Sequence, residues 1–404
     1  MSDATSEEKQ KQSIFQRGAD MIKKGATAAY DALSNPMQAL KRVQKFQETT
    51  AVLILSVITI VIIILCIVYF LYIRSLQYTN CSFLDNIYGT LNGNIRSLNY
   101  TDKRCQFKFN EYYIKTAYNC CSGGAYKNDF VSLCALKDVL KQGVRGLDFE
   151  VYSIDDRPVV ATSTTDNYYI KETYNSIDFA DIMAVVRDYA FSNSTAPNPK
   201  DPIIFHLRIK STNQNMYQNL AKLFEGYDSL LLGKEYSYEN HQENLGNRKL
   251  LDFMGKIVII VDRSNLSFME CKDFYEYVNM TSNSIFMRAL HYYDIAYTPD
   301  LNELIEYNKT NMTIGMPDKG ADPPNPSSIV MREAGVQMLG MRYQNFDTYL
   351  EENELFFNEY GYAFALKPEN LRYIPIVVEV PPLPNPEVSY ATRTVSSDYY
   401  SFNI

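Results

Sequence analysis

The longest uninterrupted apolar segment runs from Ala51 to Ile73, 23 positions without a charged side chain. A helix rises about 1.5 Å per residue, so this segment would be about 34 Å long and could cross a hydrocarbon core of about 30 Å. It starts after 50 residues and is longer than the apolar part of a cleaved signal peptide. Tyr69 and Tyr72 lie near one end, where interfacial aromatic residues are common. We therefore predict one transmembrane helix.

Residues 1–50 precede this span and have a different pattern. From Phe15 to Phe46 apolar residues recur at helical spacing, and Lys and Arg occupy the other side. This pattern predicts an amphipathic helical arm. Such an arm could lie on the cytosolic leaflet, dock on a partner, or extend the transmembrane helix.

The charges beside the span predict its orientation. Lys41, Arg42 and Lys45 precede it, whereas only Arg74 follows closely. By the positive-inside rule, the N-terminus stays on the cytosolic or inner side and the larger C-terminal part lies on the lumenal or outer side. This is a type II, single-pass topology.

Beyond residue 75 short apolar runs alternate with helical patterns, which is typical of an α/β fold with a parallel sheet or barrel. We predict helices at Phe179–Phe191 and Asn215–Phe224. No low-complexity linker divides residues 75–375, so they form one predicted domain, and a Pro-rich extended tail occupies 376–404. The predicted strands are Gly146–Tyr152, Pro158–Ala161, Ile203–Ile209, Lys256–Val261, Ser284–Arg288 and Gln337–Tyr343.

Charge restricts the classes of partner. The chain has a net charge of −8; residues 1–50 carry eight basic and six acidic side chains and the span carries none, so the remainder carries −10. Such a domain lacks the cationic face that nucleic-acid binding requires, so we expect no nucleic-acid partner. There is no Trp, but 33 Tyr and 21 Phe supply aromatic packing.

Seven cysteines leave two alternatives open. Cys66 lies in the span, and the other six could form three disulfides in an oxidising compartment or remain buried thiols. No CxxC pair indicates a zinc site. Asn-x-Ser/Thr sequons, which weakly favour a lumenal domain, begin at Asn80, Asn99, Asn193, Asn265, Asn279, Asn308 and Asn311.

Five strings together resemble phosphatidylinositol-specific phospholipase C. GVRGLDFEVY from Gly143, DPIIFHLRIKS from Asp201 and GKIVII from Gly255 resemble its X-region, and REAGVQMLGMRYQNFD from Arg332 and YAFALKPENLR from Tyr362 resemble its Y-region. Their order and spacing also match. The resemblance implies a distorted TIM barrel over residues 75–375, with functional groups at the C-terminal ends of the strands.

The family's two catalytic histidines have no counterpart in the matching strings. One serves the nucleophilic inositol hydroxyl, and the other protonates the leaving group or steadies the phosphoryl oxygens. Their positions hold Tyr118, in IKTAYNCCSGG, and Thr162, after PVVA. A phenol with a pKa near 10 and an aliphatic hydroxyl cannot exchange protons as two histidines do. The resemblance therefore implies a degenerate catalytic site.

The family's calcium site is only partly retained. Asn119, Asp148 and Glu150 match three ligand positions, with the two acidic types exchanged, but the fourth position holds Arg208. A guanidinium cannot be a calcium ligand. We predict that Arg208 pairs with Asp148 or Glu150 and fills the metal position, leaving a vestigial charge cluster and no metal or other cofactor; an ordinary surface ion pair is the alternative.

Residues that would select the inositol phosphates also differ. Ile260 and Asp262 stand where the family has lysines, and Phe364 replaces a tyrosine. The positions that still match the family are mainly those that build the barrel. This indicates a barrel retained for its shape. These retained residues are Gly335, Gln337, Met338, Leu366, Lys367 and Pro368.

Other sources of chemistry are few. His206 shares the strand face of Arg208, and His241 and His291 fall outside the matching strings; each has either a structural role or that of a relocated acid–base group. Cys121, before SGG, is a conceivable nucleophile but has no histidine near it in sequence.

These observations predict a non-catalytic barrel that links a membrane, through Ala51–Ile73, to proteins bound by the barrel surface and the Pro-rich tail. A Trp-free, Asn- and Tyr-rich barrel on a type II anchor resembles proteins of large DNA viruses that join an inner membrane to a capsid shell, which implies a virion membrane and capsid proteins as partners. The alternatives are an active phosphodiesterase with rearranged catalytic residues and a head-group-binding barrel without turnover.

Overall fold

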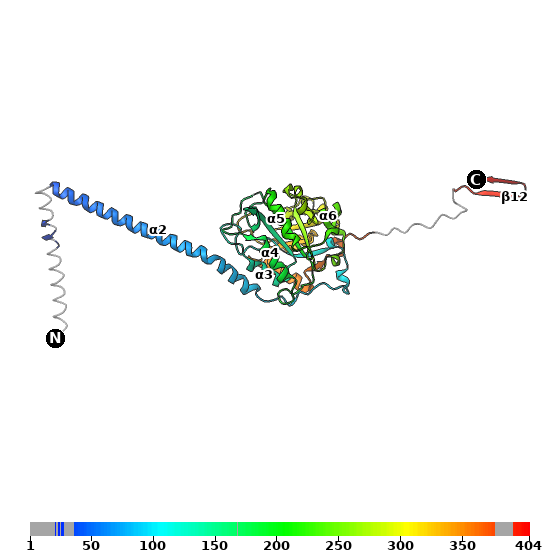
Figure 1. Cartoon of the computed structure of the whole chain (residues 1–404), viewed down its shortest axis with the longest axis horizontal. Helices are drawn as coiled ribbons and strands as arrows, with labels where there is room; N and C mark the ends of the chain where they lie inside the picture. Colours follow the sequence, from blue (N-terminus) through cyan, green and yellow to red (C-terminus); the bar gives the residue numbers. More distant parts are fainter. Residues whose placement is uncertain (1–20, 22, 25, 28–35, 168, 376–390) are drawn as a thin grey trace. The chain divides into compact units, whose positions relative to one another are not determined.

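The computed structural model describes residues 21, 23, 24, 26, 27, 36–167, 169–375 and 391–404 (Figure 1). The chain divides into two units, Met1–Leu76 and Gln77–Ile404. Most of the predicted N-terminal arm and the prolines of the predicted tail (Pro381, Pro382, Pro384 and Pro386) lie outside the described residues.

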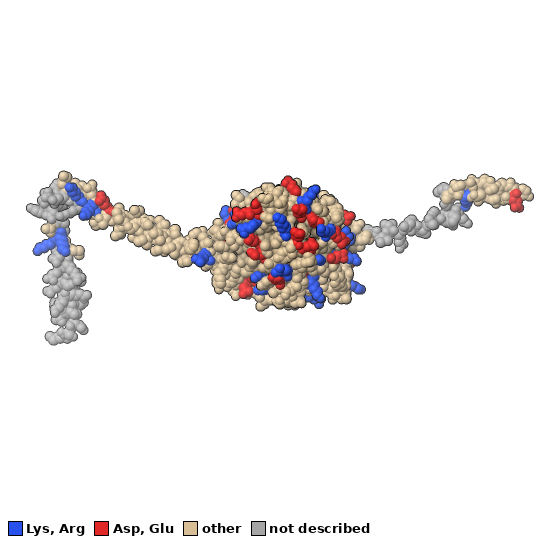
Figure 2. Space-filling view, viewed as in Figure 1, with Lys and Arg blue, Asp and Glu red and all other residues tan. Residues whose placement is uncertain are grey.

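The first unit is dominated by helix α2 (Pro36–Tyr88), whose last turns belong to the second unit. Gln44–Tyr88 is long and apolar enough to cross a membrane, and no part of its most apolar stretch is buried in the protein. Figure 2 shows the middle of α2 without Lys, Arg, Asp or Glu. A membrane would cover this surface, since exposing so many aliphatic side chains to water is unfavourable. The helix required for the predicted single span is therefore present.

The second unit contains a mainly parallel sheet that curves into a nearly closed barrel, as predicted. Neighbouring strands follow the order β7-β6-β5-β2-β1-β10-β9-β8, and no pairing joins β7 to β8 within the described residues. Two antiparallel strands, β3 and β4, extend from β2, and β11 pairs with β1. The strands are β1 (Tyr112–Ala117), β2 (Gly146–Ile154), β3 (Arg157–Ala161), β4 (Ile177–Asp178), β5 (Ile203–Ile209), β6 (Ile257–Asp262), β7 (Met280–Ser282), β8 (Met287–His291), β9 (Met312–Met316), β10 (Met338–Met341), β11 (Phe364–Leu366), β12 (Thr394–Ser397) and β13 (Tyr400–Asn403).

Helices cover the outside of the barrel, and Figure 1 shows α3, α4 and α5 across the viewed face. Local capping determines where several begin: Ser132 accepts from the Cys134 amide at α3, and Asp347 accepts from the Leu350 amide at α11. Gly361 ends α11 with φ 85°, a conformation that favours glycine. Beyond α2, the helices are α3 (Leu133–Lys141), α4 (Phe179–Val185), α5 (Gln214–Glu225), α6 (Ser237–Gln242), α7 (Lys272–Tyr275), α8 (Tyr292–Ala296), α9 (Leu301–Thr310), α10 (Ser328–Glu333) and α11 (Thr348–Tyr360).

The core lies on both faces of the sheet. All seven residues of β5 are buried, which is expected of a parallel strand covered by helices on one side and by barrel interior on the other. Aromatic rings join the layers: Phe149 in β2 contacts Phe179 in α4 and Phe205 in β5, with ring centroids 5.8 and 5.2 Å apart. Edge-to-face contacts of this kind stabilise the packing beyond the apolar area that they bury.

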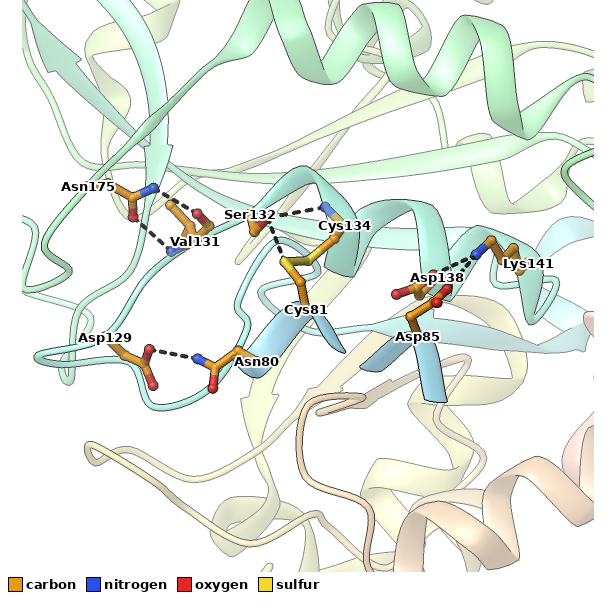
Figure 3. The surroundings of a disulfide bond; sticks show 10 residues. All are labelled: Asn80, Cys81, Asp85, Asp129, Val131, Ser132, Cys134, Asp138, Lys141 and Asn175. Carbon is orange, nitrogen blue, oxygen red and sulfur yellow. Dashed lines mark hydrogen bonds and ion pairs between the residues drawn. A yellow bond between two sulfur atoms is a disulfide. The ribbon is translucent and has the colours of Figure 1, made fainter. Parts of the chain in front are cut away.

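The barrel-side end of α2 is joined covalently to α3 (Figure 3). Cys81 and Cys134 form a disulfide, and Asn80 donates to Asp129 at 2.8 Å beside it. Further along the helix, Tyr88 is buried and its hydroxyl donates to the carbonyl of Tyr343 at 3.0 Å. Of the two alternatives for the six cysteines outside the span, each therefore applies to part of the set. One pair is a disulfide, and four are buried thiols: Cys105, Cys120, Cys121 and Cys271.

Candidate functional site

The barrel mouth, formed by the C-terminal ends of the parallel strands and the loops that follow them, contains the residues singled out from the sequence. Asn119 follows β1, Asp148 and Glu150 lie in β2, and Arg208 lies in β5. Strand register places Asp148 opposite His206 and Glu150 opposite Arg208. Because alternate residues of a strand point to one face, these side chains meet inside the barrel.

Arg208 binds all three polar residues of this group. Its Nη1 donates to Glu150 Oε1 at 2.6 Å, its Nε and Nη2 donate to the two oxygens of Asp148 at 3.0 and 2.8 Å, and Nη2 also donates to Asn119 Oδ1 at 2.8 Å. All four side chains are almost completely buried. We call Asn119, Asp148, Glu150 and Arg208 the charge cluster; it is a buried, bidentate ion-pair network and not a surface ion pair.

The electrostatics of the charge cluster favour its ionised form. Burial alone would raise the pKa of Asp148, but the charge of Arg208 and the hydrogen bonds from His206 and Arg208 outweigh it and hold that pKa well below its usual range. Burial likewise opposes the charge of Arg208, yet Asp148, Tyr118 and Glu150 raise its pKa well above the ordinary value. The guanidinium therefore remains a fixed cation between two carboxylates.

This geometry does not fit a calcium ion. The three side chains that could supply oxygen ligands each have an oxygen within 2.6–3.0 Å of an Arg208 nitrogen, so the guanidinium occupies the space and charge that a cation would need. Within the described residues, no group of three His, Cys, Asp or Glu side chains is arranged to hold a metal ion.

Tyr118 and Thr162, which the sequence resemblance singled out, both have structural contacts. The ring of Tyr118 lies against Arg208, with the guanidinium carbon 4.5 Å from the ring centroid. Burial raises the pKa of the Tyr118 phenol well above 10, and the opposing charge of Arg208 does not offset this. Thr162 donates its hydroxyl hydrogen bond to the carbonyl of Tyr126 at 3.0 Å. Neither group is arranged to transfer protons near neutral pH.

The three histidines differ in their surroundings. His206 is completely buried, with Nδ1 2.6 Å from Asp148 Oδ1 and Nε2 2.8 Å from Ser282 Oγ. His241 is exposed in α6. His291 ends β8 at the barrel mouth, with Nδ1 2.6 Å from the Pro317 carbonyl and Nε2 2.9 Å from Asp166 Oδ2. The sequence placed His291 outside every matching string, yet the fold brings it to the barrel mouth.

Sequence reasoning also missed the segment that covers the charge cluster. Residues 162–176 connect β3 to β4, and we call them the mouth loop. The Ser163 amide donates to Glu150 Oε2 at 2.8 Å, and Asp166 Oδ1 lies 3.9 Å from Arg208 Nη1. Asp166 also binds Lys319, which follows β9. The only sequence signal for this loop was the polar string STTD after a strand. This string does not reveal which residues Asp166 contacts.

The other differing positions lie in the scaffold or at the rim of the barrel. Ile260 is completely buried in β6, and Phe364 is buried in β11. Asp262, at the end of β6, accepts from the Asn283 side chain at 2.8 Å. Cys121, the conceivable nucleophile, is a buried thiol. The hydrogen bonds of Asp262 go to Ser264 and Asn283 and not to the charge cluster.

Comparison with known families agrees with this architecture. Residues 106–263 match the family described as "Phosphatidylinositol-specific phospholipase C, X domain". The barrel is phospholipase C-like. The matched segment contains β1 to β6 and every residue of the charge cluster, so the resemblance first seen in short strings is confirmed for this region.

Solved structures show the same fold. PLC21 of L. pealei has a TM-score of 0.55 with 18% sequence identity, and PLC21 of S. officinalis has 0.53 with 18%. Each comparison covers 67% of this chain but only 38% of the other chain, so this protein spans well under half of the phospholipase C chains that it resembles. The phosphatidylinositol-specific phospholipase C of Listeria monocytogenes is more distant, at 11% identity and a TM-score of 0.40 over 63% of this chain and 95% of that one. A comparison with curated proteins found no match.

Proposed function

We propose that this protein is a membrane-anchored, non-catalytic phospholipase C-like barrel that binds partner proteins and links them to the membrane. One observation carries the proposal: Arg208 lies at the centre of the charge cluster and binds the side chains that match a calcium site. The phosphodiester chemistry of such barrels needs a charged or acid–base group there that can reach the substrate. In this chain the central cation is the Arg208 guanidinium, and the carboxylates of Asp148 and Glu150 offset its charge.

The anchor and the surface support a linking role. Helix α2 supplies a single candidate span within the described residues, and the basic residues before it favour an inner-side N-terminus with the barrel across the membrane. Figure 2 shows basic and acidic side chains interspersed over the viewed face of the barrel, with no large patch of one sign on that face. Such a surface suits protein partners better than nucleic acid. In a virion, the partners would be capsid proteins outside an inner membrane.

Turnover assays test this proposal. The full chain in detergent micelles is incubated with phosphatidylinositol and with glycerophosphodiesters, once with calcium and once with a chelator. We expect no hydrolysis above that of a heat-denatured sample in either condition. Hydrolysis that disappears in Asp148→Asn or Arg208→Ala would overturn the proposal and establish the alternative, an active phosphodiesterase with rearranged catalytic groups.

That alternative has one observation in its favour. His291 lies at the barrel mouth, and Asp166 connects it to Arg208. However, both ring nitrogens of His291 already lie within hydrogen-bond distance of protein oxygens, the Pro317 carbonyl and Asp166 Oδ2. A histidine engaged in this way has no free nitrogen with which to accept a proton from a substrate hydroxyl.

A further inference from the structure

The described end of the tail forms a β-hairpin. Strands β12 (Thr394–Ser397) and β13 (Tyr400–Asn403) make a separate two-stranded antiparallel sheet, and no strand of the barrel pairs with either of them within the described residues. A lone two-stranded hairpin is only marginally stable in water, and further strands or a covered apolar face are needed to stabilise it. The hairpin therefore has surfaces that a partner can complete.

The two faces of the hairpin differ in polarity. Val395 lies opposite Phe402, and reciprocal backbone hydrogen bonds between Arg393 and Ile404 continue the ladder by one pair. Because side chains alternate along a strand, Tyr400, Phe402 and Ile404 lie on one face, and each is about half exposed. Across from them on β12 and its extension are Arg393, Val395 and Ser397. The other face has only hydroxyl and amide side chains: Thr394, Ser396, Ser401 and Asn403.

The outer edge of β13 presents backbone groups to a further strand. In an antiparallel ladder, pairs that exchange both hydrogen bonds alternate with pairs that exchange none. The bonded pair Arg393–Ile404 therefore directs the amides and carbonyls of Ser401 and Asn403 away from β12. No other element in the described part of the chain bonds to them. Charged residues or Pro normally block such an edge, and the segment YYSFNI from Tyr399 contains neither.

This edge is complementary to a second copy of itself. An antiparallel pairing centred on Phe402 sets Ser401 of each copy opposite Asn403 of the other, and their outward amides and carbonyls then form four backbone hydrogen bonds. The same register sets Phe402 against Phe402 and Tyr400 against Ile404 on the apolar face. Cross-strand pairs of aromatic and large apolar side chains stabilise a sheet. Apolar residues therefore meet apolar residues, and polar residues meet polar ones.

Charge and chain length also favour a second copy as the partner. The chain after the span has a net charge of −10, which repels two barrels, but residues 391–404 contain only Arg393 and Asp398 and are neutral overall. Residues 376–390 lie between the barrel and the hairpin in sequence, and a chain of that length can reach up to about 50 Å. Two hairpins can therefore meet while their acidic barrels stay apart.

We propose that β13 is a self-association edge, through which two membrane-anchored copies of this protein join their hairpins into one four-stranded antiparallel sheet in the order β12-β13-β13-β12. A twofold axis at Phe402 relates the copies, so each contributes the same surface. Strands of four residues are too short to bury the roughly 1,200 Å² of a stable free complex, so the pairing needs both copies in one membrane, which raises their effective concentration. The association uses the anchor of the proposed function but not the absence of turnover, so the turnover assay and the tests below fail independently.

Two proline variants test which edge pairs. Ser401 in β13 and Ser396 in β12 lie directly opposite each other, and both amides point away from the hairpin. Proline at either position removes one outward donor and no bond within the hairpin. Full chains labelled at the N-terminus with a donor or an acceptor dye are placed together in phosphatidylcholine vesicles, and energy transfer is measured as lipid dilutes the protein.

We expect Ser401→Pro to weaken the association at least about tenfold, because each copy loses a hydrogen bond and gains a ring that blocks the edge. Ser396→Pro should match the wild type, and a chain that lacks residues 391–404 should behave like Ser401→Pro. Equal energy transfer in Ser401→Pro and the wild type would overturn the proposal, and so would an equal loss in both proline variants.

Cross-linking tests the register. In a Cys66→Ser background, Phe402→Cys places the two new thiols opposite each other, whereas Tyr400→Cys lies on the same face and is set against Ile404 of the other copy. Because opposite residues of neighbouring strands are close enough for a disulfide, mild oxidation in vesicles should link Phe402→Cys chains at least about fivefold more than Tyr400→Cys chains. Equal yields from the two variants would contradict the proposed pairing.

Hydrogen exchange of the wild type distinguishes other ways of covering the hairpin. Pairing of two copies predicts that the amides of Ser401 and Asn403 become protected as the protein density in the vesicles rises. Protection in vesicles without energy transfer would assign the hairpin to the lipid surface. Protection of a monomeric chain in micelles would assign it to the barrel of the same chain. Either result would overturn the proposal.

Discussion

At the scale of single residues, Arg208 determines the character of the barrel mouth. It binds two buried carboxylates at once, so its removal leaves both without the guanidinium charge that offsets theirs in a dry environment. Breaking a buried ion pair by deleting one partner is far more costly than replacing the whole pair by neutral groups. The stability of the barrel therefore depends on Arg208 whatever the protein binds.

We expect Arg208→Met to lower the free energy of unfolding by about 3–5 kcal/mol. The triple variant Asp148→Asn, Glu150→Gln, Arg208→Met should recover most of that loss, because no buried charge remains. Arg157→Met, which removes an exposed partner of Asp178, should change stability by no more than about 1 kcal/mol. Chemical denaturation followed by circular dichroism measures all of them. If Arg208→Met and Arg157→Met lower the free energy of unfolding by the same amount, the charge cluster does not stabilise the barrel as described.

The buried Lys367 leads to a prediction about how the stability of the barrel depends on pH. Burial lowers the pKa of its ammonium to about 7, and its Nζ donates to the Asn308 carbonyl at 2.7 Å. In the unfolded chain a lysine titrates near 10.4, so between these values the folded state binds fewer protons and stability rises with pH. The contribution is at most about 1.4 kcal/mol per pH unit. Denaturation curves from pH 7 to 10 should show a smaller increase in stability for Lys367→Met than for the wild type; identical slopes would contradict this assignment.

At the scale of elements, the disulfide ties the last turns of α2 to α3 across 53 positions of sequence. By the chain-entropy model, closing a loop of this length stabilises the folded state by about 4 kcal/mol. We expect the double variant Cys81→Ser, Cys134→Ser to unfold at lower denaturant concentration than the wild type. A reductant should shift the wild type to the same midpoint and leave the double variant unchanged. A reductant effect that persists in the double variant would assign the stabilisation to other cysteines.

The elements also show what the sequence can and cannot predict. Ile203–Ile209 and α5 were predicted nearly to the residue, because a continuous apolar run and a regular amphipathic pattern are strong signals. Strand β1 was missed because Lys115 interrupts it; this lysine is buried and pairs with Glu354 of α11 at 2.7 Å, a partner that local pattern cannot reveal. The predicted strand Ser284–Arg288 lies three residues too early, since β8 spans Met287–His291.

The candidate site also has a part that the sequence predicts and a part that it does not. The convergence of Asp148, Glu150 and Arg208 follows from strand periodicity and the family pattern. The side chains around Asp166 could not be predicted, because His291 and Lys319 reach it only after the strands close into a barrel. Interactions between loops distant in sequence depend on the tertiary structure and leave no local periodicity.

At the scale of the whole molecule, the predicted topology can be tested through glycosylation. Asn99 and Asn193 are exposed, whereas Asn279 and Asn308 are buried; Asn80 and Asn265 have side-chain amides engaged in hydrogen bonds. If the barrel crosses the endoplasmic reticulum membrane, glycans should attach at Asn99 and Asn193 and be absent from the buried positions. Expression in eukaryotic cells should give an endoglycosidase-sensitive mass shift that is lost in Asn99→Gln, Asn193→Gln. No shift in the wild type would contradict the outer-side placement of the barrel.

The disulfide has a mechanical consequence under our proposal that the barrel links a membrane to partner proteins. A load applied to the chain before Cys81 passes through the sulfur–sulfur bond directly to Cys134. Residues 82–133 are then bypassed, and they include β1, which pairs with β2, β10 and β11. Along the covalent chain, a pull from the anchor would therefore reach α3 at the periphery before it reached the central strand of the barrel.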